Sequence, residues 1–196
     1  MKTLAEACED LSILAVDMPI GLADTPRPGR TCEREARALL PGKTSSVFPT
    51  PCRPALACTT HAEANALSKT LGVGLTQQTF NLFPKMREVD ALMRGSEALH
   101  PIVHEAHPEL AFARMNDGKP VLSKKRRPEG FAARLDLLAR HGFPWEPRPL
   151  PGAARDDVLD AMAVCRTALL IAQGAATRLG TEQERDRYGL PMNIWF

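Results

Sequence analysis

The sequence has few aromatic residues and almost no net charge. Phe, Trp and Tyr make up 5% of the 196 residues, and the formal net charge is +2. The shortage of aromatic rings argues against an extended base-stacking surface of the kind that single-strand-binding proteins use. A net charge near zero predicts no global attraction to nucleic acid, so any basic surface must be local.

Long apolar runs and paired cysteines are also missing. No stretch approaches the roughly 18 consecutive apolar residues of a membrane span. Glu6, Glu9 and Asp10 stand where a signal peptide has its apolar region. The five cysteines form no C-x-x-C pair, which argues against a disulfide framework and against a zinc knuckle. We therefore expect a cytoplasmic protein with reduced thiols and no membrane contact.

The rest of the composition is typical of a globular protein. Hydrophobic residues make up 44% and charged residues 24%, and the length suits one domain, residues 1–196. Strands are predicted at 12–16 and 101–110, with a weak third near 120–123. The pattern therefore favours a helix-rich α/β domain that is short of strands. Helical spacing and end signals predict helices at 2–10, 30–40, 59–72, 75–95 (kinked or restarted at Pro84), 130–142 and 154–180.

Asp17 stands at the end of a short apolar strand. Residues 13–16 are apolar, and Met18-Pro19 follows the acid. An aspartate at this point can form a turn. It can also be a functional carboxylate, since ligands gather at the carboxyl ends of strands in open α/β folds. The residues alone leave both explanations open.

Three acids open the last predicted helix, in the stretch "DDVLDA". Asp157 and Asp160 are three residues apart, so both project from one helix face. Together with Asp156 they favour the positive end of the helix dipole, but one acid would serve that purpose. Like charges on one face repel unless a cation lies between them, and oxygen ligands suit Mg²⁺ or Mn²⁺. Helix capping and a metal site remain the alternatives.

The stretch "VHEAHPEL" and several cations add further candidates. Strand alternation puts Glu105 and His107 on one face. Glu105 or Glu109 is then a further site acid. Alternatively, His107 is a buried histidine that makes structural hydrogen bonds.

"GKT" at 42–44 is not a P-loop, because Arg37 stands where its first glycine belongs. The basic run at 124–127 can contact phosphates, or it can be a solvated patch on the surface. The predicted nucleic-acid contacts are Arg53, Lys85, Lys124, Lys125, Arg126 and Arg127.

Five segments in fixed order resemble a known family. They are "VDMPIGL", "SSVFPTPCR", "GLTQQTFNLFPKMREVD", "HEAHPELAF" and "DDVLDA". Together they resemble domain of unknown function family 429, whose members are described as predicted nucleases of the RNase H-like fold. The resemblance spans nearly the whole chain. It implies an RNase H-like fold and a metal-dependent nuclease that hydrolyses phosphodiester bonds.

The resemblance also implies roles for individual acids. Asp17 takes the position of the fourth-strand acid, and Asp157 and Asp160 match the D-x-x-D of the last helix. These three would bind divalent ions, Mg²⁺ or Mn²⁺, in a two-metal site with ions about 3.5–4 Å apart. Glu105 is a further catalytic candidate, and Asp156 is a secondary one.

The chain departs from the family pattern before Asp17. Members usually begin with strands that carry a leading aspartate, and Asp10 is a poor substitute in its polar, helical context. Either the start codon is set too late, or this is a form without the first strands. A partner or a second copy, as in a homodimer, would then cover the exposed sheet edge. A non-catalytic binding or assembly module is the alternative to a nuclease. Phosphoryl transfer to a small molecule is a third hypothesis, without a glycine-rich loop to support it.

Overall fold

The computed structural model describes residues 11–148 and 150–196. The helix expected at residues 2–10 lies outside these ranges. Helices dominate the described chain, as the sequence predicts. Two short 3-10 turns, η1 (Thr44–Ser46) and η2 (Glu97–Leu99), lie between them. The α-helices are α2 (Thr31–Leu39), α3 (Arg53–Leu56), α4 (His61–Thr70), α5 (Gln77–Asn81), α6 (Phe83–Gly95), α7 (Pro108–Met115), α8 (Pro128–Arg140) and α9 (Arg155–Ala172).

Within the part of the chain that the structure describes, four very short strands lie at the centre of the molecule. β1 (Leu14–Val16) pairs in parallel with β2 (Val103–Glu105). β3 (Arg178–Leu179) pairs antiparallel with β4 (Ile194–Trp195). A bridge from Ala106 to Trp195 joins the two pairs. The fold is therefore a mixture of helix and sheet in which far more residues lie in helices than in strands.

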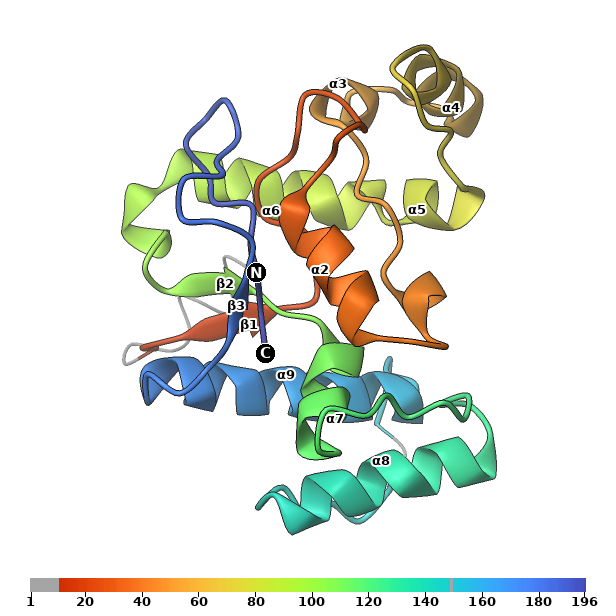
Figure 1. Ribbon diagram of the computed structural model, residues 1–196, viewed down its shortest axis with the longest axis vertical. Coiled ribbons are helices and arrows are strands. Elements are labelled where there is room, and N and C mark those ends of the chain that lie inside the picture. The colour runs from red at the N-terminus through yellow and green to blue at the C-terminus, as the bar shows by residue number, and fades with distance from the viewer. Residues whose placement is uncertain (1–10, 149) are drawn as a thin grey trace.

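The helices lie on two sides of these strands (Figure 1). In this view α3, α4, α5 and α6 lie above the strands, and α7, α8 and α9 lie below them. Helix α9 packs against β1, α7 and α8, whereas α6 packs against α3 and α5. The carboxyl end of β1 therefore lies between α6 and α9.

Local signals explain several of the observed boundaries. Thr60 caps α4 in a capping box, in which its hydroxyl accepts from the Glu63 N–H and the Glu63 carboxylate accepts from the Thr60 N–H. Pro84 lies in the first turn of α6, where its missing N–H costs nothing. The expected segment 75–95 is thus two helices, and the proline starts the second one.

Three expectations about elements were wrong in part. The strand expected at 101–110 ends at Glu105, because Pro108 begins α7. The helix expected at 154–180 ends at Ala172, and Gly174 follows with a φ of 66°, a conformation that glycine adopts readily. The weak strand near 120–123 is not formed. Strands β3 and β4 were not expected, since two residues give no readable alternation.

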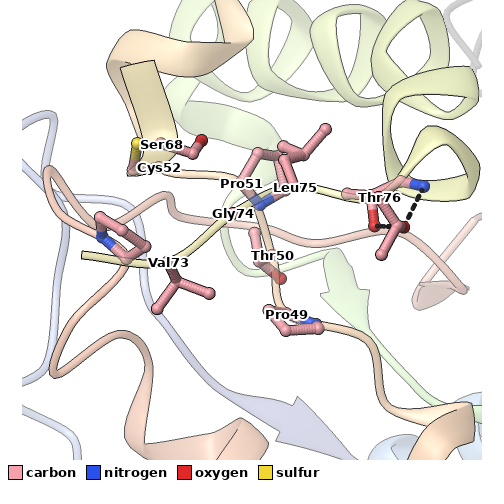
Figure 2. Close-up of a pocket in the computed structure, with 11 residues that line it drawn as sticks. Pro49, Thr50, Pro51, Cys52, Ser68, Val73, Gly74, Leu75 and Thr76 are labelled. Carbon is pink, nitrogen blue, oxygen red and sulfur yellow. Dashed lines mark hydrogen bonds between the residues drawn. The ribbon is translucent and has the colours of Figure 1, made fainter. Parts of the chain in front are cut away.

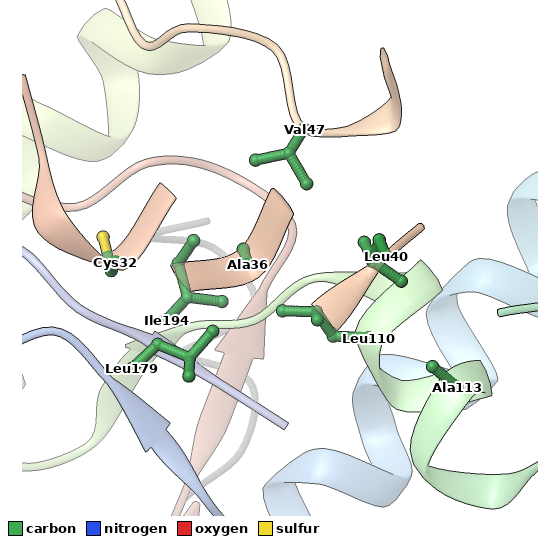
Figure 3. Packing of buried hydrophobic residues seen from close by; sticks show 8 residues of the cluster. All are labelled: Cys32, Ala36, Leu40, Val47, Leu110, Ala113, Leu179 and Ile194. Carbon is green, nitrogen blue, oxygen red and sulfur yellow. The ribbon is translucent and has the colours of Figure 1, made fainter. Parts of the chain in front are cut away.

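The core is built around α7, in which nearly every residue is buried. Figure 3 shows one of its clusters, where Leu110 and Ala113 of α7 meet Cys32 and Ala36 of α2, with Leu179 and Ile194 from the C-terminal strands. The four cysteines within the described ranges are all free thiols, as expected. No helix in those ranges has both the length and the apolar composition needed to cross a bilayer.

Candidate functional site

A cleft of about 590 Å³ lies between α6 and α9 at the carboxyl end of β1. Apolar side chains form much of its wall, and charged groups project into it from both helices. Such a volume is in the range of small-molecule and cofactor sites. Its charged lining residues are Asp17, Lys85, Glu88, Lys125, Asp157 and Asp160.

The cleft brings together the three acids that the sequence singled out as metal ligands. Asp17 follows β1 directly, and Asp157 and Asp160 lie on successive turns of α9. Because α9 packs against β1, residues that are far apart in the sequence meet here. The predicted convergence of strand end and helix start is therefore confirmed for these residues, although their chemical role stays a prediction.

Burial perturbs the pKa of two of these acids. Loss of hydration raises the pKa of Asp17, and the nearby Asp160 raises it further, while His107 and Lys125 oppose the shift. The Asp17 side chain reaches solvent through the cleft, but protein surrounds it on its other sides. Burial also raises the pKa of Asp160 against the opposing effect of Lys125. Negative charge in this cleft is thus only partly compensated.

Lys125 supplies the main counter-charge within the cleft. Its ammonium group donates a hydrogen bond to Asp160 and lies 3.6 Å from the Asp156 Oδ2 atom. Burial lowers the pKa of Lys125, but the hydrogen bond to Asp160 and the charge of the neighbouring aspartates raise it on balance. A lysine therefore stands where the sequence predicts a metal cation beside the α9 acids.

The carboxylates do not form a closed metal cage. Within residues 11–148 and 150–196, no group of three or more His, Cys, Asp or Glu side chains is arranged to hold a metal ion. In the same ranges the carboxylates of Asp17 and Asp157 accept no hydrogen bond and form no ion pair. Mg²⁺ is usually held by one or two carboxylates, with water and substrate phosphate completing its shell. The residues fit an ion held in that way.

The other predicted acids have structural partners. Glu105 is buried and accepts hydrogen bonds from both Nη atoms of Arg30 and from the Ile20 N–H, which lies 2.8 Å away. It lines a hollow of about 30 Å³ behind Asp17, not the large cleft. Glu109 pairs with the buried Arg134. Both carboxylates are engaged in ion pairs with buried arginines, although Glu109 lies near enough to Asp160 to raise the pKa of that acid.

The predicted phosphate contacts divide into separate locations. Lys85 and Lys125 line the large cleft. Arg126 and Arg127, together with Lys125, line an adjoining groove of about 380 Å³. Lys124 is exposed and belongs to neither lining. Arg53 lies elsewhere, where it pairs with aspartates at 90 and 186 and covers the ring of Tyr188.

Sequence reasoning gave no site role to three charged or aromatic residues that line these two hollows. Glu88 was recognisable, because its position three residues after Lys85 places both on one face of α6. Phe131 and Arg155 line the basic groove, and no local pattern marks them. They come together only because α8 and the start of α9 pack against each other.

A further small hollow, away from the cleft and the groove, has too little volume for a substrate. It holds about 30 Å³ and is lined by Pro49, Thr50, Ser68 and Leu75 among others (Figure 2). The Ser68 hydroxyl is buried there without a hydrogen-bond partner in the described chain. A single water fits both the volume and the unpaired hydroxyl.

Comparison with known families agrees with the motifs in the cleft. The family described as "Protein of unknown function (DUF429)" has a model that matches residues 1–185. The chain belongs to this family. The match includes Asp17, Asp157 and Asp160 and the basic groove beside them. No curated protein and no solved structure matches the chain, and the family's description names no activity.

Proposed function

We infer that this DUF429 protein is a divalent-metal-dependent hydrolase of nucleic-acid phosphodiesters with an RNase H-like fold. The convergence of Asp17, Asp157 and Asp160 on one cleft, beside a groove rich in cations, is the observation that supports it. Acids that can hold a metal and cations that can hold a phosphate backbone are the two parts that such a reaction needs.

Each group in the cleft has a role in this reaction. Asp17, Asp157 and Asp160 would hold Mg²⁺ or Mn²⁺, which when bound supplies an activated water and neutralises charge on the leaving oxygen. Lys125 would move from Asp160 to a phosphate oxygen, since its four-carbon chain is flexible. Lys85, on the opposite wall, would contact the same phosphate backbone.

One observation favours a second function. Lys125 already neutralises the α9 acids, and the described residues offer no three-ligand metal group. The protein would then be a non-catalytic binding or assembly module. The edge of β1 would receive a partner strand or a second copy, since β1 pairs only with β2 within the described ranges.

Cleavage assays separate the two functions. Single-stranded, duplex and branched oligonucleotides are incubated with the protein in Mg²⁺, in Mn²⁺ and in EDTA. We expect cleavage only with metal, and a loss on the order of a hundredfold in Asp157→Asn, equivalent to about 2.7 kcal/mol of barrier. Asp136→Asn is the matched control, because Asp136 is an exposed acid that pairs with Arg140 on α8.

Metal binding gives the second readout. Mn²⁺ affinity is measured by calorimetry for the wild-type protein, Asp157→Asn and Asp136→Asn. The nuclease hypothesis fails if no substrate is cut and Asp157→Asn binds Mn²⁺ as the wild-type protein does. That result would favour the binding module.

A further inference from the structure

The groove beside the acidic cleft has the opposite charge. Its lining includes four cations, Lys125, Arg126, Arg127 and Arg155, and one acid, Asp156. Lys125 and Arg126 lie within ion-pair distance of Asp156, at 3.6 and 3.2 Å. Within the described ranges, Arg127 and Arg155 pair with no carboxylate. The groove therefore has a net positive charge available for a phosphate.

An arginine lies over an aromatic ring in this groove. The Arg155 guanidinium lies over the Phe131 ring, 4.5 Å from its centroid, and the Arg155 side chain is exposed. Trp145 lies behind Phe131, with the two ring centroids 6.3 Å apart. The ring covers the guanidinium from one side. Unstacked bases of single strands stack on such guanidinium planes.

The groove and the cleft are parts of one continuous surface. Lys125 lines both hollows, and the consecutive residues Asp156 and Asp157 line the groove and the cleft, respectively. A backbone whose phosphate lies in the groove would pass directly into the acidic cleft. A volume of about 380 Å³ is enough for a group of small-ligand size.

We propose that this groove binds a single-stranded segment of nucleic acid, with a phosphate at Arg126 and Arg127 and one unpaired base stacked on Arg155. The inference rests on the proposed function and specifies its substrate. A duplex keeps its bases stacked inside, so it offers nothing to the Arg155 plane. One stacking position is also compatible with the small number of aromatic residues in the sequence.

Binding is tested in EDTA, so that it does not depend on cleavage. Fluorescence anisotropy measures the affinity of labelled single-stranded DNA and RNA, of the same sequence as a duplex, and of an abasic single strand. We expect single strands to bind most tightly. Arg155→Ala should weaken their binding about tenfold or more, because stacking of one base is worth roughly 1–3 kcal/mol.

Arg155→Lys separates stacking from charge. It keeps the positive charge and removes the plane, so we expect weaker binding of the normal strand and unchanged binding of the abasic strand. Arg127→Ala should weaken the binding of both strands. It should also reduce the slope of log affinity against log salt concentration by about 0.7, the value for one lost phosphate contact to a single strand. Arg140→Ala is the control, because it removes one positive charge from an exposed position of α8 outside the groove.

The outcomes separate this inference from the proposed function. Tight binding in EDTA that depends on Arg155, without cleavage in any metal, supports the groove and contradicts the nuclease. Cleavage with wild-type affinity in both Arg155 variants overturns the groove and leaves the nuclease standing. Equal affinity for duplex and single strand, or wild-type binding by Arg155→Lys, also overturns the stacking proposal.

Discussion

A buried ion pair holds the turn that carries Asp17. Arg30 and Glu105 are almost fully buried, and both bind the backbone of Ile20. The Arg30 guanidinium donates to the Ile20 carbonyl oxygen, and the Glu105 carboxylate accepts from the Ile20 N–H. Ile20 lies three residues after Asp17 and follows the turn at Met18-Pro19. Glu105, which the sequence suggested as a further catalytic candidate, thus positions the chain that leaves β1.

Removal of one partner of this pair should be costly. Arg30→Met leaves the Glu105 carboxylate buried without its cation, and we expect a loss of about 3–5 kcal/mol in the free energy of unfolding. Urea denaturation followed by circular dichroism measures it. The double variant Arg30→Met/Glu105→Met should recover at least about 1 kcal/mol, because no charge is then left unpaired. A double variant as unstable as the single one would contradict this account.

At the scale of elements, a close contact positions the basic segment before α8. Gly130 lies in the first turn of α8, and a Cβ atom there would come 2.2 Å from the Lys124 carbonyl oxygen. The buried Arg134 donates to the carbonyl oxygens of Ser123 and Gly130. The segment 123–127 is therefore fixed against α8, and three of its cations, Lys125, Arg126 and Arg127, line the groove or the cleft.

Gly130→Ala should displace that segment. Alanine normally favours a helix over glycine by about 1 kcal/mol, but the contact with Lys124 should reverse the sign and cost about 1–3 kcal/mol. Chemical denaturation measures stability, and anisotropy in EDTA measures oligonucleotide binding; both should weaken. Gly95→Ala in α6 is the control, because nothing lies within 4 Å of its added Cβ. Equal stability of the two variants would refute the contact.

Elements with local signals were predictable, and those set by distant contacts were not. Thr60 and Pro84 mark helix starts through hydrogen bonds and ring geometry within one turn, so sequence reasoning found α4 and α6. Asp17 and the α9 acids were found because they end a strand and begin a helix. The Arg30 partner of Glu105 lies 75 residues away, and no spacing rule connects them. The Arg155–Phe131 contact is equally non-local.

At the scale of the whole molecule, the cleft and the adjoining groove place aspartates in different electrostatic surroundings. Asp17 lines the cleft between α6 and α9, where loss of hydration on its protein-facing side raises its pKa. Asp156, on the groove side, differs. Burial would raise its pKa, but Arg126 and Lys125 outweigh burial and lower it. Two aspartates of the same surface should therefore affect global stability with opposite signs.

The pH dependence of unfolding tests this difference. The pKa of Asp17 is raised in the folded state, so the folded protein binds more protons than the unfolded chain above the ordinary value of 3.8. Its contribution to stability is present at low pH and is lost as pH rises through the folded pKa. In chelator, Asp17→Asn should therefore gain stability relative to the wild-type protein as pH rises, and the gain should level off once Asp17 is fully ionised.

Asp156→Asn is the matched comparison with the reverse sign. Because the folded pKa of Asp156 is lowered, its contribution is present above the ordinary value of 3.8 and is lost as pH falls through the folded pKa. This variant should be less stable than the wild-type protein at neutral pH, and the difference should shrink in acid. Urea midpoints across the pH range measure both variants. Parallel profiles would mean that the cleft and the groove do not differ in their electrostatic environment.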